Sequence, residues 1–264
     1  MVEPVASLRA AEVEAATGWR VAAYAALPST SDEAARRRDA GEDHVVVVAD
    51  AQTAGRGRGG NRFASPPGGL YASLVLRVPP DDLPGPTVAA TAVALGEAVE
   101  ALVGVPVALK WPNDLWIDGR KVAGLLLEAS AVAGRAVPVV VGVGVNVDRV
   151  PETLPPDVAA TTTALALHAR HPVSREALLT AFLRRLDARR LDLATAAGRD
   201  ALEDAYRRRL ALLGEPVRFL VGDVVHGGVL RDVSLARGLL VEATGGVSTW
   251  WAAAHVRELR PARP

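Results

Sequence analysis

Two lysines separated by a short acidic stretch are the residues best suited to chemistry in this sequence. Lys110 and Lys121 lie in LKWPNDLWIDGRKVAGLLLE with Asp114 between them, and all other Lys and Arg positions are arginines. A lysine ammonium is a compact point charge that can follow a moving anion. Two ammonium groups and one carboxylate suit a nucleotide phosphate and its Mg²⁺. The alternative, a charged hairpin face that only prevents edge pairing, is disfavoured because arginine would serve there equally well.

A β-hairpin is expected to bring these three side chains together. Asp118-Gly119 is a two-residue signal for a type I′ turn, which pairs Trp116 with Lys121. Side chains two residues apart on a strand share a face, so counting back from Trp116 places Asp114 and Lys110 on that face. The sequence therefore predicts that Lys110, Asp114 and Lys121 point the same way.

A glycine-rich loop is the second candidate for anion binding. Residues 55–60, GRGRGG, have the G-x-G-x-x-G spacing of a dinucleotide site. That motif should open a helix, but here it runs into NRFASPPGG, where Pro66-Pro67 prevents one. What remains is a flexible loop whose Arg56 and Arg58 can fold over an anion and bind phosphate oxygens. A solvated loop with solubilising charges is the open alternative.

Composition excludes several classes of protein. The chain has 264 residues, no net charge and no cysteine, so a broad nucleic-acid or membrane footprint, disulfides and Cys-based zinc sites are not expected. The N-terminus does not resemble a signal peptide and no stretch approaches a membrane span, which favours a cytoplasmic protein. His168 and His171 are three residues apart, but no third metal ligand is apparent and surface histidines are commoner.

Hydrophobic patterning predicts a mixed α/β domain followed by a small all-β domain. A capping box at Thr30 and Glu33 is expected to begin a helix that stops at Gly41. After Gly214, short strands alternate with glycine-containing turns, as in a small barrel. The expected boundary gives domains 1–213 and 214–264. Strands are predicted at 44–50, 70–78, 105–111 and 136–148, and helices at 85–104, 174–193 and 199–212.

Five blocks in this order resemble the biotin protein ligase family, in its short class without an N-terminal DNA-binding domain. They are STS at 29–31, QTAGRGRGG at 52–60, KWPNDL at 110–115, RKVAGLLLE at 120–128 and GVGVNV at 142–147. The resemblance covers about residues 20–262. It implies a catalytic core related to class II tRNA synthetases, followed by an SH3-like barrel.

The resemblance also implies a two-step reaction that uses ATP, biotin and Mg²⁺. Biotin would be activated as biotinyl-5′-AMP and then transferred to a lysine of a biotin carboxyl carrier domain. Acetyl-CoA, acyl-CoA or pyruvate carboxylase would supply that domain. The implied protein works without DNA or a membrane, as a monomer or weak homodimer.

Site residues carry over from the matching blocks. Lys121 would lie at the biotin carboxylate and the α-phosphate, with Lys110 in the same motif. Two of the matching positions depart from some relatives, which have Asn at the position of Ser31 and Trp at that of Phe63; Phe still stacks but lacks the indole N–H. The full implied set is Lys121, Arg56, Arg58 and Lys110 for catalysis; Ser29, Thr30, Ser31, Gln52, Gly55, Gly57, Arg58, Phe63, Gly124 and Asn146 for biotin and nucleotide; and Asp114 for Mg²⁺.

Two other functions remain as alternatives at this stage. A lipoate or octanoate ligase or transferase belongs to the same superfamily, but the combination of GRGRGG with KWPND argues against it. A non-catalytic regulator that holds biotin or its adenylate is disfavoured by the neutral charge and by the lack of a basic reading element.

Overall fold

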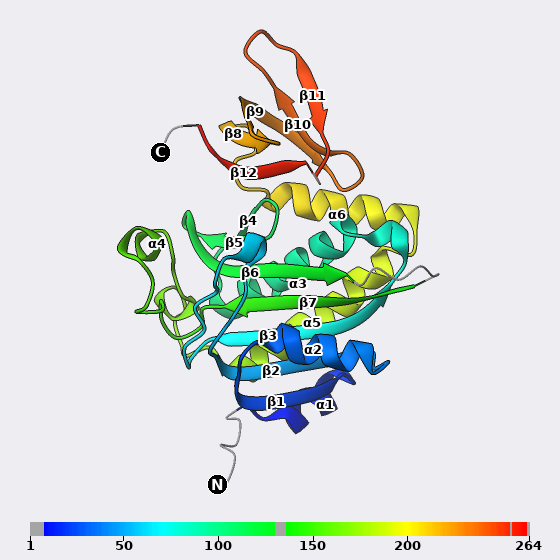
Figure 1. Ribbon diagram of the computed structural model, residues 1–264, viewed down its shortest axis with the longest axis vertical. Helices are drawn as coiled ribbons and strands as arrows, with labels where there is room; N and C mark the ends of the chain where they lie inside the picture. Colours follow the sequence, from blue (N-terminus) through cyan, green and yellow to red (C-terminus); the bar gives the residue numbers. More distant parts are fainter. Residues whose placement is uncertain (1–7, 130–135, 254, 263–264) are drawn as a thin grey trace.

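A seven-stranded mixed sheet forms the centre of the larger part of the molecule (Figure 1). The computed structural model describes residues 8–129, 136–253 and 255–262. The strand order is β1-β2-β3-β7-β6-β5-β4; β1 and β2 are parallel, and every other pair is antiparallel. The strands are β1 (Arg20–Leu27), β2 (Val45–Gln52), β3 (Leu70–Val78), β4 (Ala108–Lys110), β5 (Asp114–Ile117), β6 (Arg120–Ala129) and β7 (Val137–Val145).

Helices cover the two faces of this sheet unequally. The long helices α3 and α5 lie behind it in Figure 1, and α2 lies in front over β2 and β3. The apolar runs of β2, β3 and β7 are buried because both faces of the central strands are covered. The helices are α1 (Ala10–Thr17), α2 (Thr30–Asp39), α3 (Gly85–Val103), α4 (Pro156–Ala160), α5 (Arg175–Asp192) and α6 (Ala196–Arg209).

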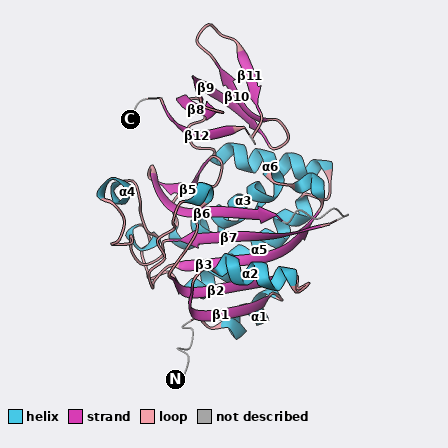
Figure 2. Cartoon of the chain, viewed as in Figure 1, coloured by secondary structure: helices cyan, strands magenta, loops and turns pink. Residues whose placement is uncertain are grey.

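The C-terminal segment folds as a separate five-stranded antiparallel sheet in the order β11-β10-β9-β8-β12 (Figure 2). This confirms the expected mixed α/β fold with a small SH3-like β domain. Arg207 of α6 joins the two parts by an ion pair to Asp232, with Nε 2.6 Å from Oδ1. We propose the division at 213/214, between α6 and β8. The strands are β8 (Pro216–Val221), β9 (Val224–Ser234), β10 (Gly238–Glu242), β11 (Ser248–Trp251) and β12 (Val256–Pro261).

The sequence predicted that no stretch approaches a membrane span, and helix α3 differs from that prediction in its length and composition. In the described part of the chain it is the one helix long and apolar enough to cross a membrane by length and composition. However, 67% of that window is buried inside the protein, where α3 packs against α5 and α6. It is therefore a core helix, and its apolar surface is satisfied by packing.

The start of the chain departs from the predicted elements. The sequence predicted neither α1 nor β1, and β1 pairs in parallel with β2 at the sheet edge. The predicted capping box is wrong: the N-cap of α2 is Ser29, whose side chain accepts a hydrogen bond from the Ser31 N–H at 3.2 Å. Glu33 turns to other partners. Gly41 does follow the end of α2 with a positive φ of 85°.

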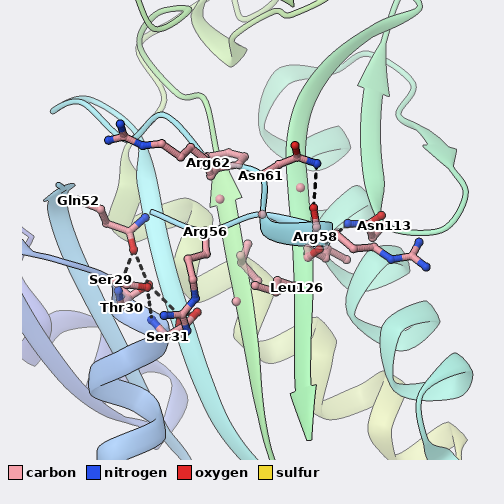
Figure 3. A pocket seen from close by; sticks show the side chains of 18 of the residues that line it. Ser29, Thr30, Ser31, Gln52, Arg56, Arg58, Asn61, Arg62, Asn113 and Leu126 are labelled. Carbon is pink, nitrogen blue, oxygen red and sulfur yellow. Dashed lines mark hydrogen bonds between the residues drawn. The ribbon is translucent and has the colours of Figure 1, made fainter. Parts of the chain in front are cut away.

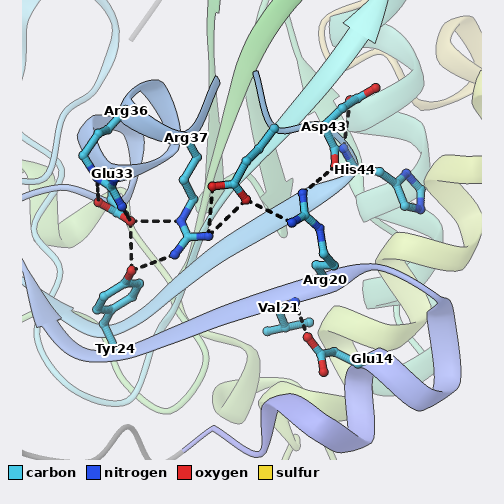
Figure 4. Close-up of polar contacts among 10 residues, drawn as sticks. Glu14, Arg20, Val21, Tyr24, Glu33, Arg36, Arg37, Asp43 and His44 are labelled. Carbon is cyan, nitrogen blue, oxygen red and sulfur yellow. Dashed lines mark hydrogen bonds and ion pairs between the residues drawn. The ribbon is translucent and has the colours of Figure 1, made fainter. Parts of the chain in front are cut away.

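Glu33 lies at the centre of a charged network between α2 and the sheet edge (Figure 4). Its carboxylate accepts hydrogen bonds from Arg36, from Arg37 and from the Tyr24 hydroxyl, the last at 2.8 Å. The Arg36 hydrogen bond is the main cause that lowers the pKa of Glu33 from 4.5 to about 2. Arg37 extends the network to Glu42, which also pairs with Arg20.

Replacing Glu33 by glutamine is expected to lower the free energy of unfolding by about 2 kcal/mol at pH 7. This is less than the full pKa shift corresponds to, because solvent screens the ion pair with the exposed Arg36. Because the pKa of Glu33 is depressed in the folded state, its stabilisation is complete above pH 4.5 and is lost as the pH falls toward 2. Urea unfolding of both proteins from pH 7 to pH 3 measures this. Asp39→Asn, at an exposed carboxylate on the same helix, is the control. A Glu33→Gln deficit that does not shrink in acid would contradict the assignment.

Candidate active site

The hairpin of β5 and β6 presents Lys121 as the sequence predicted. Ile117 pairs with Arg120 and Trp116 with Lys121, around a turn in which Asp118 and Gly119 both have positive φ. A bulge after Leu115 shifts the register toward Asp114. The Lys121 ammonium lies 2.8 Å from Oδ1 of Asp114, and both side chains line one cavity.

Lys110 lies outside the residues that line this cavity. Its ammonium is 5.2 Å from the centre of the Trp116 ring. Burial lowers the pKa of Lys110 from its usual value, and Asp114 opposes that shift. The lysine pair thus shares the expected face, but only Lys121 reaches the cavity of about 210 Å³.

Glycines form the floor of the cavity. Gly124 of β6 pairs directly with Gly144 of β7, and Gly142 pairs with Ser73 of β3. A Cβ on Gly142 would lie 3.0 Å from the Ser31 hydroxyl, and a Cβ on Gly124 would lie 3.2 Å from the Lys121 ammonium. The strands therefore approach the site without side chains, which leaves room for a flat ligand.

Hydroxyl groups at the start of α2 form one wall (Figure 3). Ser73 contacts both the Thr30 hydroxyl at 2.8 Å and the Ser31 hydroxyl at 3.1 Å. The Gln52 amide oxygen accepts from the Thr30 N–H at 2.8 Å, and its nitrogen donates to Ser65 at 2.8 Å. These bonds fix the polar wall before any ligand arrives.

Phe63 covers the glycine floor from the loop side. Its ring is so near Gly144 that a Cβ there would lie 2.5 Å from it, and the Lys121 ammonium is 6.0 Å from the ring centre. The loop is held on both sides: Phe63 donates its N–H to the Gly55 carbonyl at 2.9 Å, and the Tyr71 hydroxyl donates to the Pro66 carbonyl at 2.7 Å. A ligand on this floor must displace the ring, so Phe63 is placed to act as a lid.

The two loop arginines diverge. Arg56 forms ion pairs with Asp32 of α2 and, at 3.2 Å, with Glu128 of β6. Arg58 extends toward Asn113, on the other side of the loop (Figure 3). Arg58 also lines a neighbouring, mainly apolar cavity of about 230 Å³. Both arginines line the site, but their guanidinium groups do not converge on one point.

Most residues implied by the sequence resemblance line this cavity, and three do not. Asn146 is buried and donates its side-chain N–H to the Thr163 carbonyl at 3.0 Å. Gly55 is the buried first residue of the loop, and Lys110 lies beside Trp116. The implied residues that line the cavity are Ser29, Thr30, Ser31, Gln52, Arg56, Gly57, Arg58, Phe63, Asp114, Lys121 and Gly124.

Comparison with known proteins gives the family of the chain. The Biotin/lipoate A/B protein ligase family matches residues 24–146. The chain is 35% identical to the biotin--[acetyl-CoA-carboxylase] ligase of Mycobacterium tuberculosis, over 96% of this chain and 95% of that protein. The chain belongs to the biotin protein ligase family. A solved biotin protein ligase from Aquifex aeolicus, in complex with biotin and ATP, superposes on this family member with a TM-score of 0.77 at 25% identity, covering 92% of this chain and 99% of that one.

Another relative is longer than this chain. The bifunctional ligase/repressor BirA of Bacillus subtilis is 36% identical over 57% of this chain. The match spans about half of that relative's length, 47%.

The sequence did not predict several of the residues that line the cavity. Ser73 is a fully buried polar residue in the apolar run of β3, and that contrast was the available signal. Gly142 and Gly144 alternate along β7, which marks one sheet face for close approach. Asn113 donates its side-chain N–H to the Leu125 carbonyl at 2.6 Å, a contact that only the fold reveals. Arg62 and Asn61 of the loop also line the cavity.

The residues present fit a Mg²⁺ ion that arrives with nucleotide phosphates. Mg²⁺ commonly takes one or two protein carboxylates together with phosphate oxygens and water. Asp114 is the one carboxylate among the residues that line the described cavity. Asp114, which pairs with Lys121, would be the protein ligand of such an ion.

Proposed function

We propose that this chain is an ATP-dependent biotin–protein ligase. It would activate biotin as biotinyl-5′-AMP and transfer the biotinyl group to a lysine of a biotin carboxyl carrier domain. The observation that carries the proposal is the position of Lys121, paired with Asp114 beside a glycine floor and opposite the hydroxyl wall at the start of α2. That arrangement fits a small ligand with a polar head at the wall and a carboxylate at Lys121.

In the first step a carboxylate oxygen of biotin attacks the α-phosphorus of ATP, and the bond to the β-phosphate oxygen breaks. Two anions must approach one another, so cations have to lower their repulsion. Lys121 supplies one positive charge at this point, and Arg56, Arg58 and Arg62 on the loop supply others around the cavity. A bound Mg²⁺ would neutralise further phosphate charge. Pyrophosphate leaves.

In the second step the acceptor lysine attacks the carbonyl of the mixed anhydride. An amide forms, AMP leaves with the bonding electrons, and the amine loses a proton. Water competes for the same carbonyl, so the site must stay closed until the acceptor arrives. The loop anchored at Gln52 and Tyr71 would provide that cover, with the Phe63 ring moved off the floor and lying over the bound adenylate.

The acceptor is proposed from the names of the relatives. Two of them, from Mycobacterium tuberculosis and Paracoccus denitrificans, are biotin--[acetyl-CoA-carboxylase] ligases. An acetyl-CoA or acyl-CoA carboxylase carrier domain is therefore the proposed partner, with pyruvate carboxylase as the second source. We further propose that the protein works in the cytoplasm, without DNA or a membrane, as a monomer or weak homodimer.

Arg56→Ala is expected to release biotinyl-5′-AMP about tenfold faster, with a smaller effect on biotin affinity, because a closed loop controls release. Arg56 ties the loop to α2 and β6, whereas the hydroxyl wall does not depend on it. A chase of labelled adenylate measures the off-rate. Arg62→Ala, which keeps both Arg56 ion pairs, is the comparison. An unchanged off-rate for Arg56→Ala would remove its clamping role.

Pyrophosphate exchange into ATP is the test of the function. With Mg²⁺ present, exchange that depends on biotin, but not on lipoate or octanoate, is the expected result. Exchange with lipoate or octanoate alone would assign the chain to that branch of the superfamily. Tight biotin binding with no exchange would leave a non-catalytic binding protein and refute the proposal.

A further inference from the structure

The segment 161–168 holds the main chain of Lys121 from behind. The Lys121 N–H donates to the Thr161 carbonyl, and the Thr163 N–H donates to the Lys121 carbonyl, both at 2.8 Å. The same segment accepts the side-chain N–H of Asn146 at the Thr163 carbonyl. Lys121 is therefore fixed at both of its own peptide groups by one stretch outside the hairpin.

His168, at the end of this segment, connects it to the turn of the hairpin. Its Nε2 lies 2.8 Å from the Thr163 hydroxyl, and its Nδ1 lies 3.5 Å from a carboxylate oxygen of Asp118. The His168 side chain is only 7% exposed, so the surface position expected from the sequence is wrong. The two ring nitrogens of His168 therefore face two different neighbours, the Thr163 hydroxyl at Nε2 and the Asp118 carboxylate at Nδ1.

The turn has the positive φ that a type I′ Asp-Gly pair adopts: Asp118 has a φ of 49°, and its side chain is 77% exposed. Among the contacts that the described residues make, His168 is the group that joins this turn to the segment pairing with Lys121. Movement of the turn would move Lys121, which is two residues after Gly119.

We propose that His168 is a positioning residue for Lys121, acting through Asp118 on the turn and Thr163 on the segment behind it. This inference rests on the proposed function in one respect, namely that Lys121 faces the reacting groups. His168 is not among the residues that line the cavity. Its effect is expected on the turnover number of adenylation and not on biotin binding.

The kinetic test uses His168→Ala and Thr163→Val. Each is expected to lower the kcat of biotin-dependent pyrophosphate exchange about tenfold with little change in the KM for biotin, since small misplacements of a reacting group cost up to about a hundredfold. His168→Gln and Thr163→Ser, which keep a hydrogen-bonding group, should recover much of the loss. The double variant should be no slower than the worse single one, because both break one chain of contacts. His171→Ala, at an exposed histidine three residues away, is the matched control.

A second readout follows Lys121 directly. Because the chain has only two lysines, ¹⁵N-lysine labelling gives two lysine main-chain amide signals. His168→Ala and Thr163→Val should raise the hydrogen-exchange rate of the Lys121 amide about tenfold relative to Lys110, since they loosen the partner of that amide. A variant that has the wild-type circular dichroism spectrum, and a changed hydrogen-exchange rate at the Lys121 amide but not at the Lys110 amide, is not generally unfolded.

The outcomes separate the two proposals. Wild-type protein without biotin-dependent exchange would refute the proposed function, while the amide measurement would still decide whether His168 holds Lys121. If the wild-type protein is active, two results would overturn the positioning role. One is a wild-type kcat in both variants. The other is a lower kcat with an unchanged hydrogen-exchange rate at the Lys121 amide. A change confined to the KM for biotin would overturn it too.

Discussion

Lys121→Ala is expected to abolish adenylate formation in a protein that remains folded. The variant removes the ammonium nearest the expected meeting point of carboxylate and α-phosphate, and it leaves the Asp114 carboxylate without the partner that lies at 2.8 Å. Removing one group that stabilises developing charge costs about a hundredfold to a thousandfold in rate, and the residual carboxylate adds repulsion. Biotin-dependent pyrophosphate exchange measures the loss.

Lys110→Met is the informative comparison for that experiment. Lys110 lies on the Trp116 ring outside the cavity wall, so its loss should affect stability more than rate. Exchange within about tenfold of wild type is expected, because the reacting groups keep their positions. Near-wild-type pyrophosphate exchange in Lys121→Ala would contradict a role for Lys121 in the reaction. A larger loss in Lys110→Met than in Lys121→Ala would reverse the two roles.

The hairpin was the part of the site that the sequence predicted best. An Asp-Gly turn sets strand register by itself, so the pairing of Trp116 with Lys121 and the approach of Asp114 followed from local rules. The position of Lys110 relative to the cavity did not follow, because it depends on the loop and floor that enclose the ligand space. Strand spacing predicts a shared face, but it does not predict which member of that face reaches a cavity.

Long-range packing explains the remaining differences. Strand β1, RVAAYAAL, is an edge strand whose residues are mostly half-buried, without alternation of buried and exposed positions, and its pairing with β2 identifies it. The arginines of the loop were expected to converge on one anion, but Arg56 finds Asp32 and Glu128, which are far away in the sequence. His168 gave no sequence signal of a structural role, because Asp118 and Thr163 reach it only after folding.

The glycine loop and the hydroxyl wall depend on each other through Gln52. Its amide oxygen holds Thr30 at the wall, and its amide nitrogen holds Ser65 at the far end of the loop. A ligand that displaces the Phe63 ring must therefore move the loop. The end of that loop is fixed to the same wall that the ligand contacts. Gln52 is therefore one link between the loop and the wall, beside the ion pair of Arg56 with Asp32 of α2.

Gly55→Ala is expected to weaken binding of biotin and its adenylate about tenfold to hundredfold, because overpacking costs about 1–3 kcal/mol. A Cβ at Gly55 would lie 2.5 Å from the Phe63 carbonyl oxygen, 2.7 Å from the Ser65 hydroxyl and 3.0 Å from the Gln52 amide nitrogen. The first of these atoms is main chain and cannot rotate away, so the loop has to separate from its anchor at Gln52.

Isothermal titration with biotin measures this effect, and Gly57→Ala provides the comparison on the same loop. A Cβ at Gly57 would meet the Asn61 carbonyl oxygen at 3.4 Å, an ordinary contact, and Gly57 already has extended backbone angles. Its loss of affinity should therefore be much smaller. Equal effects at the two glycines would mean that the loop responds to lost flexibility. A selective effect at Gly55 would mean that close approach to Phe63 and Gln52 is what shapes the binding site.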